Sequence, residues 1–231
     1  MPAPTLRKWL GIELVEVSTA EKLIAALGGG LSILALIYFS FWALPESAAP
    51  LIISSMGASA VLLFAVPHGQ LSQPWPVIAG HGFSALIGVA CAQNISLPIA
   101  AAACAVGLSI AVMHQLKCIH PPGGATAFTA VMGGSAIQNL GYHFVIFPVL
   151  MNAVLMVLMA VGINSLFKWR RYPAILNQPS PPRKPAVPTD VPPPTHEEVL
   201  AAVRSLDSFV DINEEDLVRL VTMLNRHRSQ P

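Results

Sequence analysis

The sequence predicts an all-α, polytopic helical membrane protein, and two observations carry this prediction. Charge is almost absent from the middle of the 231-residue chain, where only Glu46 and Lys117 carry a formal charge between Ile24 and Phe167. The same stretch divides at prolines and short polar loops into apolar blocks of about 16 to 26 residues, which is the length of a membrane-crossing helix. The net charge of +1 gives no indication of a nucleic-acid partner, whereas the blocks predict contact with a lipid bilayer.

The N-terminal residues 1–18 are predicted to form an interfacial helix, because apolar residues recur there at helical spacing among charged ones. Ser18 and Glu21 have the spacing of a capping box, so the first membrane helix is expected to begin near Thr19 and to run to Leu44. Charged residues leave no room near the N-terminus for the apolar core of a signal peptide.

Five further apolar blocks complete a membrane domain predicted over residues 19–171. They extend over residues 48–66, 77–95, 97–116, 121–136 and 142–167. The sixth block ends in cations that predict a membrane stop on the cytoplasmic side, namely Lys168, Arg170 and Arg171. The three cysteines lie in or beside these blocks without a Cys-x-x-Cys pair, so we interpret them as small buried apolar residues.

The C-terminal part of the chain is predicted to lie outside the membrane. Proline is so frequent in residues 172–194 that an extended linker is expected there. Residues 195–231 then read as a soluble helical hairpin, with helix starts at Thr195 and Asn213. Such a small pair of helices needs a further surface for stability, so it is expected either to dock as a tail or to mediate contact with a partner or a homo-oligomer.

A short internal repeat relates the second block to the fifth. Gly57-Ala-Ser-Ala60 matches Gly124-Ala-Thr-Ala127, and each motif sits in the middle block of three. The membrane domain is therefore predicted to consist of two three-segment halves with two short, broken helices. Paired short segments interrupted by glycine or proline, at corresponding positions in two halves, point to the binding site of a transporter.

The positions of lysine and arginine predict the orientation. With six crossings and cytoplasmic N- and C-termini, all the membrane-flanking cations fall on the cytoplasmic side. The two halves are then inverted repeats. If the two short segments were re-entrant loops instead, four crossings would remain, Lys117 would lie outside, and the halves would be parallel.

The stretch from Cys118 to Ser135 is the predicted centre of the protein, because its prolines and glycines interrupt regular helix in an apolar setting. Irregular backbone at membrane depth is tolerated where protein buries it or where it lines a polar cavity. Amides left free at the two motif helices would bind an anion without a full cation. The predicted substrate-binding residues are His120, Pro121, Pro122, Gly123, Gly124 and Thr126 from this stretch, with Gly57, Ser59 and His81 from earlier blocks.

Two alternatives to this interpretation stay open. The small residues of the two motifs would also allow helices to cross closely, with no solute involved. A histidine inside the membrane is a functional candidate by default, yet His81 and His120 could each be neutral and satisfied by a backbone carbonyl. In the transport interpretation, His120 donates a hydrogen bond or carries a coupling proton.

The sequence favours no enzyme and no cofactor. Histidines such as His81, His114 and His120 lie in or beside the apolar blocks, but their spacing matches no metal-ligand motif and no cluster of carboxylates or cysteines accompanies them. A Ser-His-Asp arrangement has no acid available inside the membrane. A membrane sensor or scaffold that signals through its C-terminal helices is the alternative to a transporter.

The run His-Pro-Pro-Gly-Gly-Ala-Thr-Ala, from His120 to Ala127, resembles the hallmark of the HPP family of integral membrane proteins. The stretch from Gly57 to Phe64 is also similar to that family. The resemblance covers roughly residues 19 to 170, and it implies a compact domain of four to six membrane segments. It also implies transport of nitrite, because some plastid and cyanobacterial members act in that process. The segment from Val210 to Leu217 is similar to bacterial members, which implies the bacterial cytoplasmic membrane.

Overall fold

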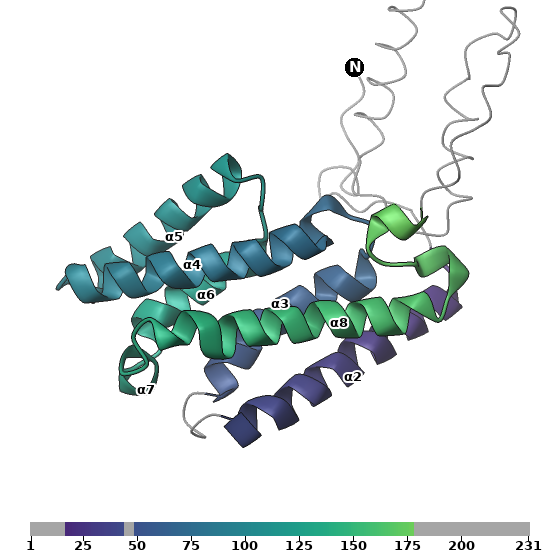
Figure 1. Cartoon of the computed structure of the whole chain (residues 1–231), viewed down its shortest axis with the longest axis horizontal. Helices are drawn as coiled ribbons and strands as arrows, with labels where there is room; N and C mark the ends of the chain where they lie inside the picture. Colours follow the sequence, from purple (N-terminus) through teal and green to yellow (C-terminus); the bar gives the residue numbers. More distant parts are fainter. Residues whose placement is uncertain (1–16, 44–48, 178–231) are drawn as a thin grey trace, which may run out of the picture. The chain divides into compact units, whose positions relative to one another are not determined.

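The computed structural model describes residues 17–43 and 49–177, and these residues form helices and loops without a strand (Figure 1). The described residues from Leu23 onward belong to one compact unit. The predicted interfacial helix, most of the linker and the predicted C-terminal hairpin lie outside the described residues.

The helices follow the predicted blocks closely. They are α2 (Thr19–Ala43), α3 (Ala49–Ala65), α4 (Pro74–Asn94), α5 (Pro98–Gln115), α6 (Pro121–Met132), α7 (Ser135–Gln138) and α8 (Met151–Ser165). The predicted start of the first helix is confirmed, because the Glu21 amide donates to Ser18 Oγ at 3.2 Å. Proline opens α4, α5 and α6, as expected for a residue that has no amide hydrogen to satisfy in the first turn.

Four helical stretches are long and apolar enough to cross a membrane: Thr19–Trp42, Pro74–Asn94, Pro98–Gln115 and Val145–Ser165. The helices α3 and α6, which carry the two repeated motifs, have 17 and 12 residues, so both are shorter than any of these four stretches. An all-α fold is therefore confirmed for the described residues, and the number of full crossings beyond four stays a prediction.

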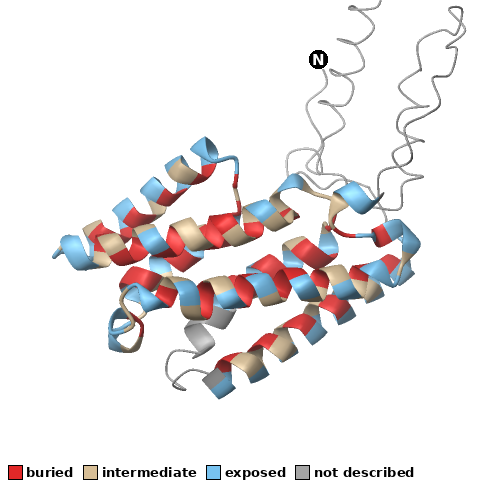
Figure 2. Ribbon diagram, in the orientation of Figure 1, coloured by how far each residue is buried: buried red, intermediate tan, exposed pale blue. Residues whose placement is uncertain are grey.

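Many residues on the helices are exposed (Figure 2), and large apolar side chains are among them. Exposed examples from four helices are Leu27 and Leu31 on α2, Val61 on α3, Ile99 and Leu108 on α5, and Leu158 on α8. In water such a surface would drive aggregation, whereas lipid tails are as apolar as leucine. The polar side chains that are buried instead face the interior between helices.

The ends of three helices meet at the start of α4. Ser72 Oγ donates to Leu62 O of α3 at 2.9 Å, and Trp75 Nε1 donates to Leu116 O, just after α5, at 3.1 Å. After α8, the hydroxyl of Tyr172 donates to Ser72 O at 2.8 Å. These contacts place the ends of α3, α5 and α8 at one end of the bundle. Three exposed cations lie in the loops there, and we call it the basic end: Lys117, Lys168 and Arg171.

Two blocks are less continuous than predicted. The sixth block contains a break at Phe147, whose backbone is extended (φ −133°, ψ 116°), because Pro148 has no amide hydrogen to donate and its ring excludes regular helix there. The fifth block ends as a helix at Met132, and Gly134 adopts a positive φ of 79° before the short α7. Proline and glycine thus interrupt helices that their apolar composition alone would continue.

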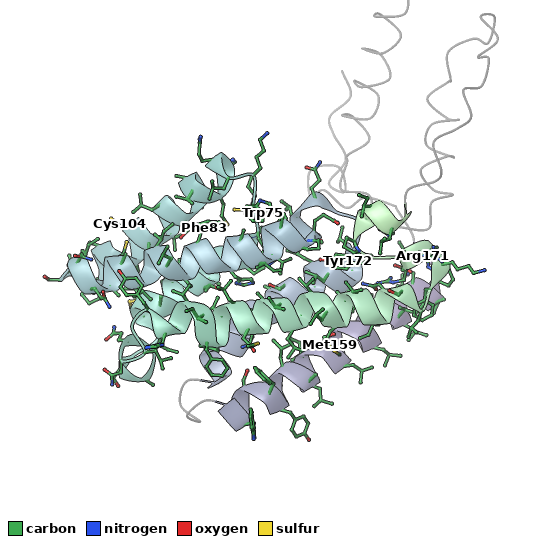
Figure 3. The ribbon with its side chains drawn as sticks, viewed as in Figure 1. Trp75, Phe83, Cys104, Met159, Arg171 and Tyr172 are labelled. Atoms are coloured by element: carbon green, nitrogen blue, oxygen red, sulfur yellow. The ribbon has the colours of Figure 1, made fainter. Side chains whose placement is uncertain are left out.

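Arg170 has a different role from the predicted membrane stop. Its side chain is buried, donates from Nη2 to Phe64 O at 2.6 Å, and donates from Nε to Asn164 Oδ1 at 3.2 Å. Phe64 lies in the last turn of α3, where free carbonyls carry partial negative charge, so the guanidinium caps that helix. Tyr172 is also fully buried, so the packed domain extends into the segment predicted as linker, whereas the neighbouring Arg171 is exposed (Figure 3).

We expect Arg170→Met to destabilise the protein strongly. It removes two hydrogen bonds from a charged donor, each worth about 1.5–3 kcal/mol, and leaves buried acceptors behind. Thermal unfolding in detergent should show a clear fall in Tm. Arg171→Met is the matched control, because this exposed neighbour should change stability by no more than about 0.5 kcal/mol. Equal Tm values for the two variants would contradict the capping role.

Candidate functional site

The helices α4 and α6 touch through their backbones. A methyl group at Gly123 would lie 2.8 Å from Gly80 O, and one at Gly88 would lie 2.7 Å from both Ala127 O and Ala130 Cβ. Gly80 and Gly88 stand two helical turns apart on one face of α4, in the small-residue pattern that brings membrane helices together. Because the pairs 80–123 and 88–127 both meet, α4 and α6 run in the same direction.

This close contact brings two histidines and a serine together. Ser59 of α3 lies with its Oγ 2.8 Å from Nε2 of His81, on α4, and 2.8 Å from Nε2 of His120. His120 is the extended residue that directly precedes α6. The two imidazole rings meet edge to face, with their centroids 4.9 Å apart. One hydroxyl thus bridges two imidazoles that are 39 positions apart in the chain.

The remaining ring nitrogens also have partners. His81 Nδ1 lies 2.7 Å from Thr126 Oγ1, and that hydroxyl lies 3.3 Å from Pro122 O one turn earlier in α6. His120 Nδ1 lies 2.9 Å from Leu71 O, in the turn before α4. We call the four side chains of Ser59, His81, His120 and Thr126 the histidine network. Its members are at most 1% exposed, so they exchange hydrogen bonds with each other and with backbone.

The Leu71 carbonyl sets the direction of the hydrogen bonds in the neutral network, with the Ser59 hydroxyl donating to His120 Nε2 at 2.8 Å rather than to the more distant Ser55 O at 3.4 Å. Leu71 O can only accept, so His120 carries its proton on Nδ1 and its Nε2 must accept. Ser59 therefore donates to His120, and His81 donates to Ser59 from Nε2. His81 Nδ1 is then an acceptor, and Thr126 donates to it. The hydrogen bonds run in one direction, from Thr126 through both rings to Leu71.

The predicted residues divide into those inside the network and those outside it. His81, His120, Ser59 and Thr126 meet, and Pro122 and Gly123 are buried beside them. Gly57 and Gly124 are only partly buried, and a methyl group on either would meet nothing within 4 Å. Pro121 is exposed. The serine and the threonine, which hold corresponding places in the repeated motif, both bind His81.

The predicted anion site at free helix amides is not what the structure shows. Gly57 lies in the middle of α3 rather than at its start. Pro121 and Pro122 do not unwind the helix, because they form its first turn and have no amide hydrogen to offer. The Gly123 amide donates to His120 O at 2.8 Å. The polar groups that gather are therefore side chains and not helix ends.

A cavity of about 280 Å³ lies between the C-terminal ends of α4 and α6 and the start of α5. Its lining includes Gln93, Ser96 and Gln138, together with apolar side chains. Sequence reasoning missed it, because it forms where residues from four separate segments converge. Between this cavity and His81, the close contact at Gly88 brings α4 and α6 together.

No three side chains of His, Cys, Asp or Glu within the described ranges come close enough together to hold a metal ion. Sequence reasoning also missed the Leu71 carbonyl, which orients the network. No side-chain pattern marks a backbone acceptor, and the short turn Gln70–Ser72 brings this one to His120.

Apolar helices that expose large hydrophobic side chains, and that bury a polar network between them, define a polytopic membrane protein. The chain belongs to the HPP family, since the family's model described as "HPP, transmembrane region" matches residues 15–173.

Two transmembrane proteins of Dictyostelium discoideum are similar to this chain. One is 38% identical over 148 residues, which cover 62% of this chain and 51% of the relative. The other is 38% identical over 149 residues, covering 62% of this chain and 47% of the relative. The alignments thus span about half the length of these relatives. No solved structure matches the chain.

Proposed function

We propose that this protein is a membrane transporter or channel for a small solute, with the histidine network as its site. One observation carries the proposal: two histidines share a hydroxyl in the interior of an apolar bundle, at the contact of three helices. Ionisable side chains inside a membrane domain are costly, and they mark substrate or proton pathways by default.

A small inorganic anion is the solute that this site favours, and nitrite is the first candidate because of the family resemblance. The described residues from Leu23 to Asn177 contain no aspartate or glutamate, so no carboxylate repels an anion there. Imidazole N–H groups and the hydroxyls of Ser59 and Thr126 supply hydrogen-bond donors. Opening of the network would release these donors to a solute.

In this proposal the structure is an occluded state, because the tight contact of α4 and α6 at Gly88 separates the histidine network from the cavity near Gln93. Exchange with the cavity near Gln93 then requires α4 and α6 to separate, as in transporters whose two halves rock around a shared site. The two motif residues that bind His81 from α3 and α6 would be the corresponding parts of an inverted repeat. We place the basic end in the cytoplasm of a bacterial cell, with six crossings.

Cysteine labelling tests that orientation. A cysteine introduced at Lys117 should react with a membrane-impermeant thiol reagent only after the cytoplasmic side is opened, because Lys117 is exposed at the basic end. Cys104, which is exposed, is first replaced by serine to lower the background. A cysteine in place of Ser96, between α4 and α5, should show the opposite sidedness. Labelling of both positions from the same side would contradict six alternating crossings.

Reconstituted flux tests the function itself. Purified full-length protein in liposomes is offered a panel of small anions that includes nitrite, with and without an imposed proton gradient. The proposal predicts uptake of at least one anion above that of protein-free liposomes. Uptake equal to the protein-free background for every anion would overturn it.

A further inference from the structure

We propose that the histidine network holds one exchangeable proton and relays it between His81 and His120 through the Ser59 hydroxyl. The inference rests on the proposed function in one respect, since it makes the proton the coupling ion of that transport. Ser59 Oγ makes two short contacts, both 2.8 Å, which join Nε2 of one ring to Nε2 of the other.

An added proton is accommodated on His81 without an unpaired donor. Nδ1 of His81 then carries a hydrogen and donates to Thr126 Oγ1, and the Thr126 hydroxyl turns to Pro122 O, 3.3 Å away. The bonds from His81 to Ser59 and from Ser59 to His120 keep their direction. Hydrogen bonds to every donor offset part of the cost of burying this charge, although no carboxylate of the described residues from Leu23 to Asn177 pairs with it.

The same proton is accommodated equally well on His120. Both nitrogens of His120 then donate, Nδ1 to Leu71 O and Nε2 to Ser59 Oγ. Ser59 now donates to His81 Nε2, and His81 Nδ1 keeps its donation to Thr126. Every donor again has an acceptor, so the two charged states differ only in which ring carries the charge.

The transfer between these states conserves every atom. The N–H bond at His81 Nε2 breaks as an O–H bond forms at Ser59 Oγ. In the same step, the original O–H bond of Ser59 breaks as an N–H bond forms at His120 Nε2. Ser59 ends with one hydrogen, as it began, and one positive charge has moved from ring to ring. The added proton comes from water, and it binds at His81 Nδ1, the nitrogen of that ring that carries no hydrogen in the neutral network.

The surroundings contain few groups that could compete for this proton. The helix α8 packs against α4, and it has no titratable residue between Met151 and Ser165. From α5, Cys104 and His114 are both exposed. The segment before α6 contributes Cys118, which is buried, and its carbonyl faces Gly80. No charged side chain from α3 between Ser54 and Ala65 faces the rings, because that stretch has none. The two histidines are thus the groups at this site that can take up the proton.

Nitrogen-15 NMR of the histidine rings, in the full-length protein in lipid bilayers, tests the relay. The signals of the two rings are identified by their loss in His81→Asn and in His120→Asn. At high pH we expect the proton on Nε2 of His81 and on Nδ1 of His120. On acidification, both rings should change over the same pH range, and together they should take up one proton. Opposite tautomers at high pH, or one full proton on each ring, would overturn the relay.

Two variants with matched controls keep the test decisive. Ser59→Ala removes the bridge, so the proton should stay on one ring instead of being shared by both. Ser32→Ala removes a buried serine of α2 that bonds within its own helix, to Gly28 O, and should leave the sharing unchanged. Thr126→Val removes the acceptor for His81 Nδ1, so the proton should stay on His120. Thr129→Val is the control for this variant. The Thr129 hydroxyl lies one turn later and makes an exposed hydrogen bond to Ala125 O in its own helix, so its loss should leave both rings unchanged. A proton still shared by both rings in Ser59→Ala or in Thr126→Val would refute the relay.

Anion flux in the same preparations separates the two proposals. Flux by a protein whose rings share no proton leaves transport standing and refutes the relay. A shared proton in a protein that moves no anion supports the relay and refutes the transport proposal.

Discussion

His81→Leu should abolish anion flux while the protein stays folded. Leucine removes both ring nitrogens that join Ser59 to Thr126, so the hydrogen bonds between these two hydroxyls and His81 are lost. The remaining partners are satisfied without it, because Ser59 still donates to His120 and Thr126 turns to Pro122 O. Leucine is similar to histidine in volume, so we expect a stability loss below about 1.5 kcal/mol.

The measurement is flux in proteoliposomes with equal amounts of inserted protein, checked by thermal unfolding. His114→Leu is the control, because His114 is exposed near the end of α5 and touches no member of the network. We expect the control to transport like the parent protein. Parental flux in folded His81→Leu would remove His81 from the site.

Gly123→Ala should destabilise the protein although it adds only one methyl group. Its methyl group would lie 2.8 Å from Gly80 O and 2.9 Å from Ser84 Oγ, closer than carbon atoms of real side chains come to such neighbours. The nearest obstacle is backbone, so α4 and α6 must move apart. Overpacking of this kind costs about 1–3 kcal/mol. It also separates His81 from Thr126, so flux should fall with stability.

Gly124→Ala provides the control at the next position. A methyl group there meets nothing within 4 Å, and a helical glycine replaced by alanine gains about 0.5–1 kcal/mol. Thermal unfolding should therefore rank the three proteins as Gly124→Ala, parent and Gly123→Ala, in order of falling Tm. Two variants with the same Tm would show that α4 and α6 are not held in backbone contact.

Sequence reasoning predicted the helices well, for a physical reason. A bilayer demands long apolar stretches, so each helix is marked by its composition. The predicted starts near Thr19 and at Pro121 match the structure, whereas α4 begins at Pro74, ahead of the predicted block 77–95. What composition could not show is the break at Phe147, because one proline in an aliphatic run does not reveal whether the helix bends or stops.

The members of the network could be predicted, but their arrangement could not. His81 and His120 stand out as ionisable groups in apolar blocks, and the internal repeat singles out Ser59 and Thr126. The prediction assigned the binding to backbone amides, since glycine and proline usually indicate an interrupted helix. Only packing shows that Gly80, Gly88 and Gly123 allow helix contact, and that side chains provide the polar groups.

Arg170 was assigned to the wrong environment for a similar reason. A cation after an apolar block usually lies among lipid headgroups, and Lys168 and Arg171 are indeed exposed. Arg170 turns inward because the end of α3 offers the carbonyl of Phe64, and Asn164 offers a second acceptor. The sequence pattern does not indicate that either acceptor lies next to Arg170 in the folded protein.

Anion flux by Ser59→Ala tests the central claim most directly, because Ser59 Oγ lies 2.8 Å from a ring nitrogen of each histidine. The parent protein, Ser59→Ala and Ser32→Ala are compared in liposomes at equal insertion, with protein-free liposomes as background. Both serines are buried, so the comparison removes the same group from two interior sites. We predict that Ser32→Ala transports like the parent and that Ser59→Ala falls to the background. Parental flux in Ser59→Ala would contradict the assignment of the histidine network as the transport site.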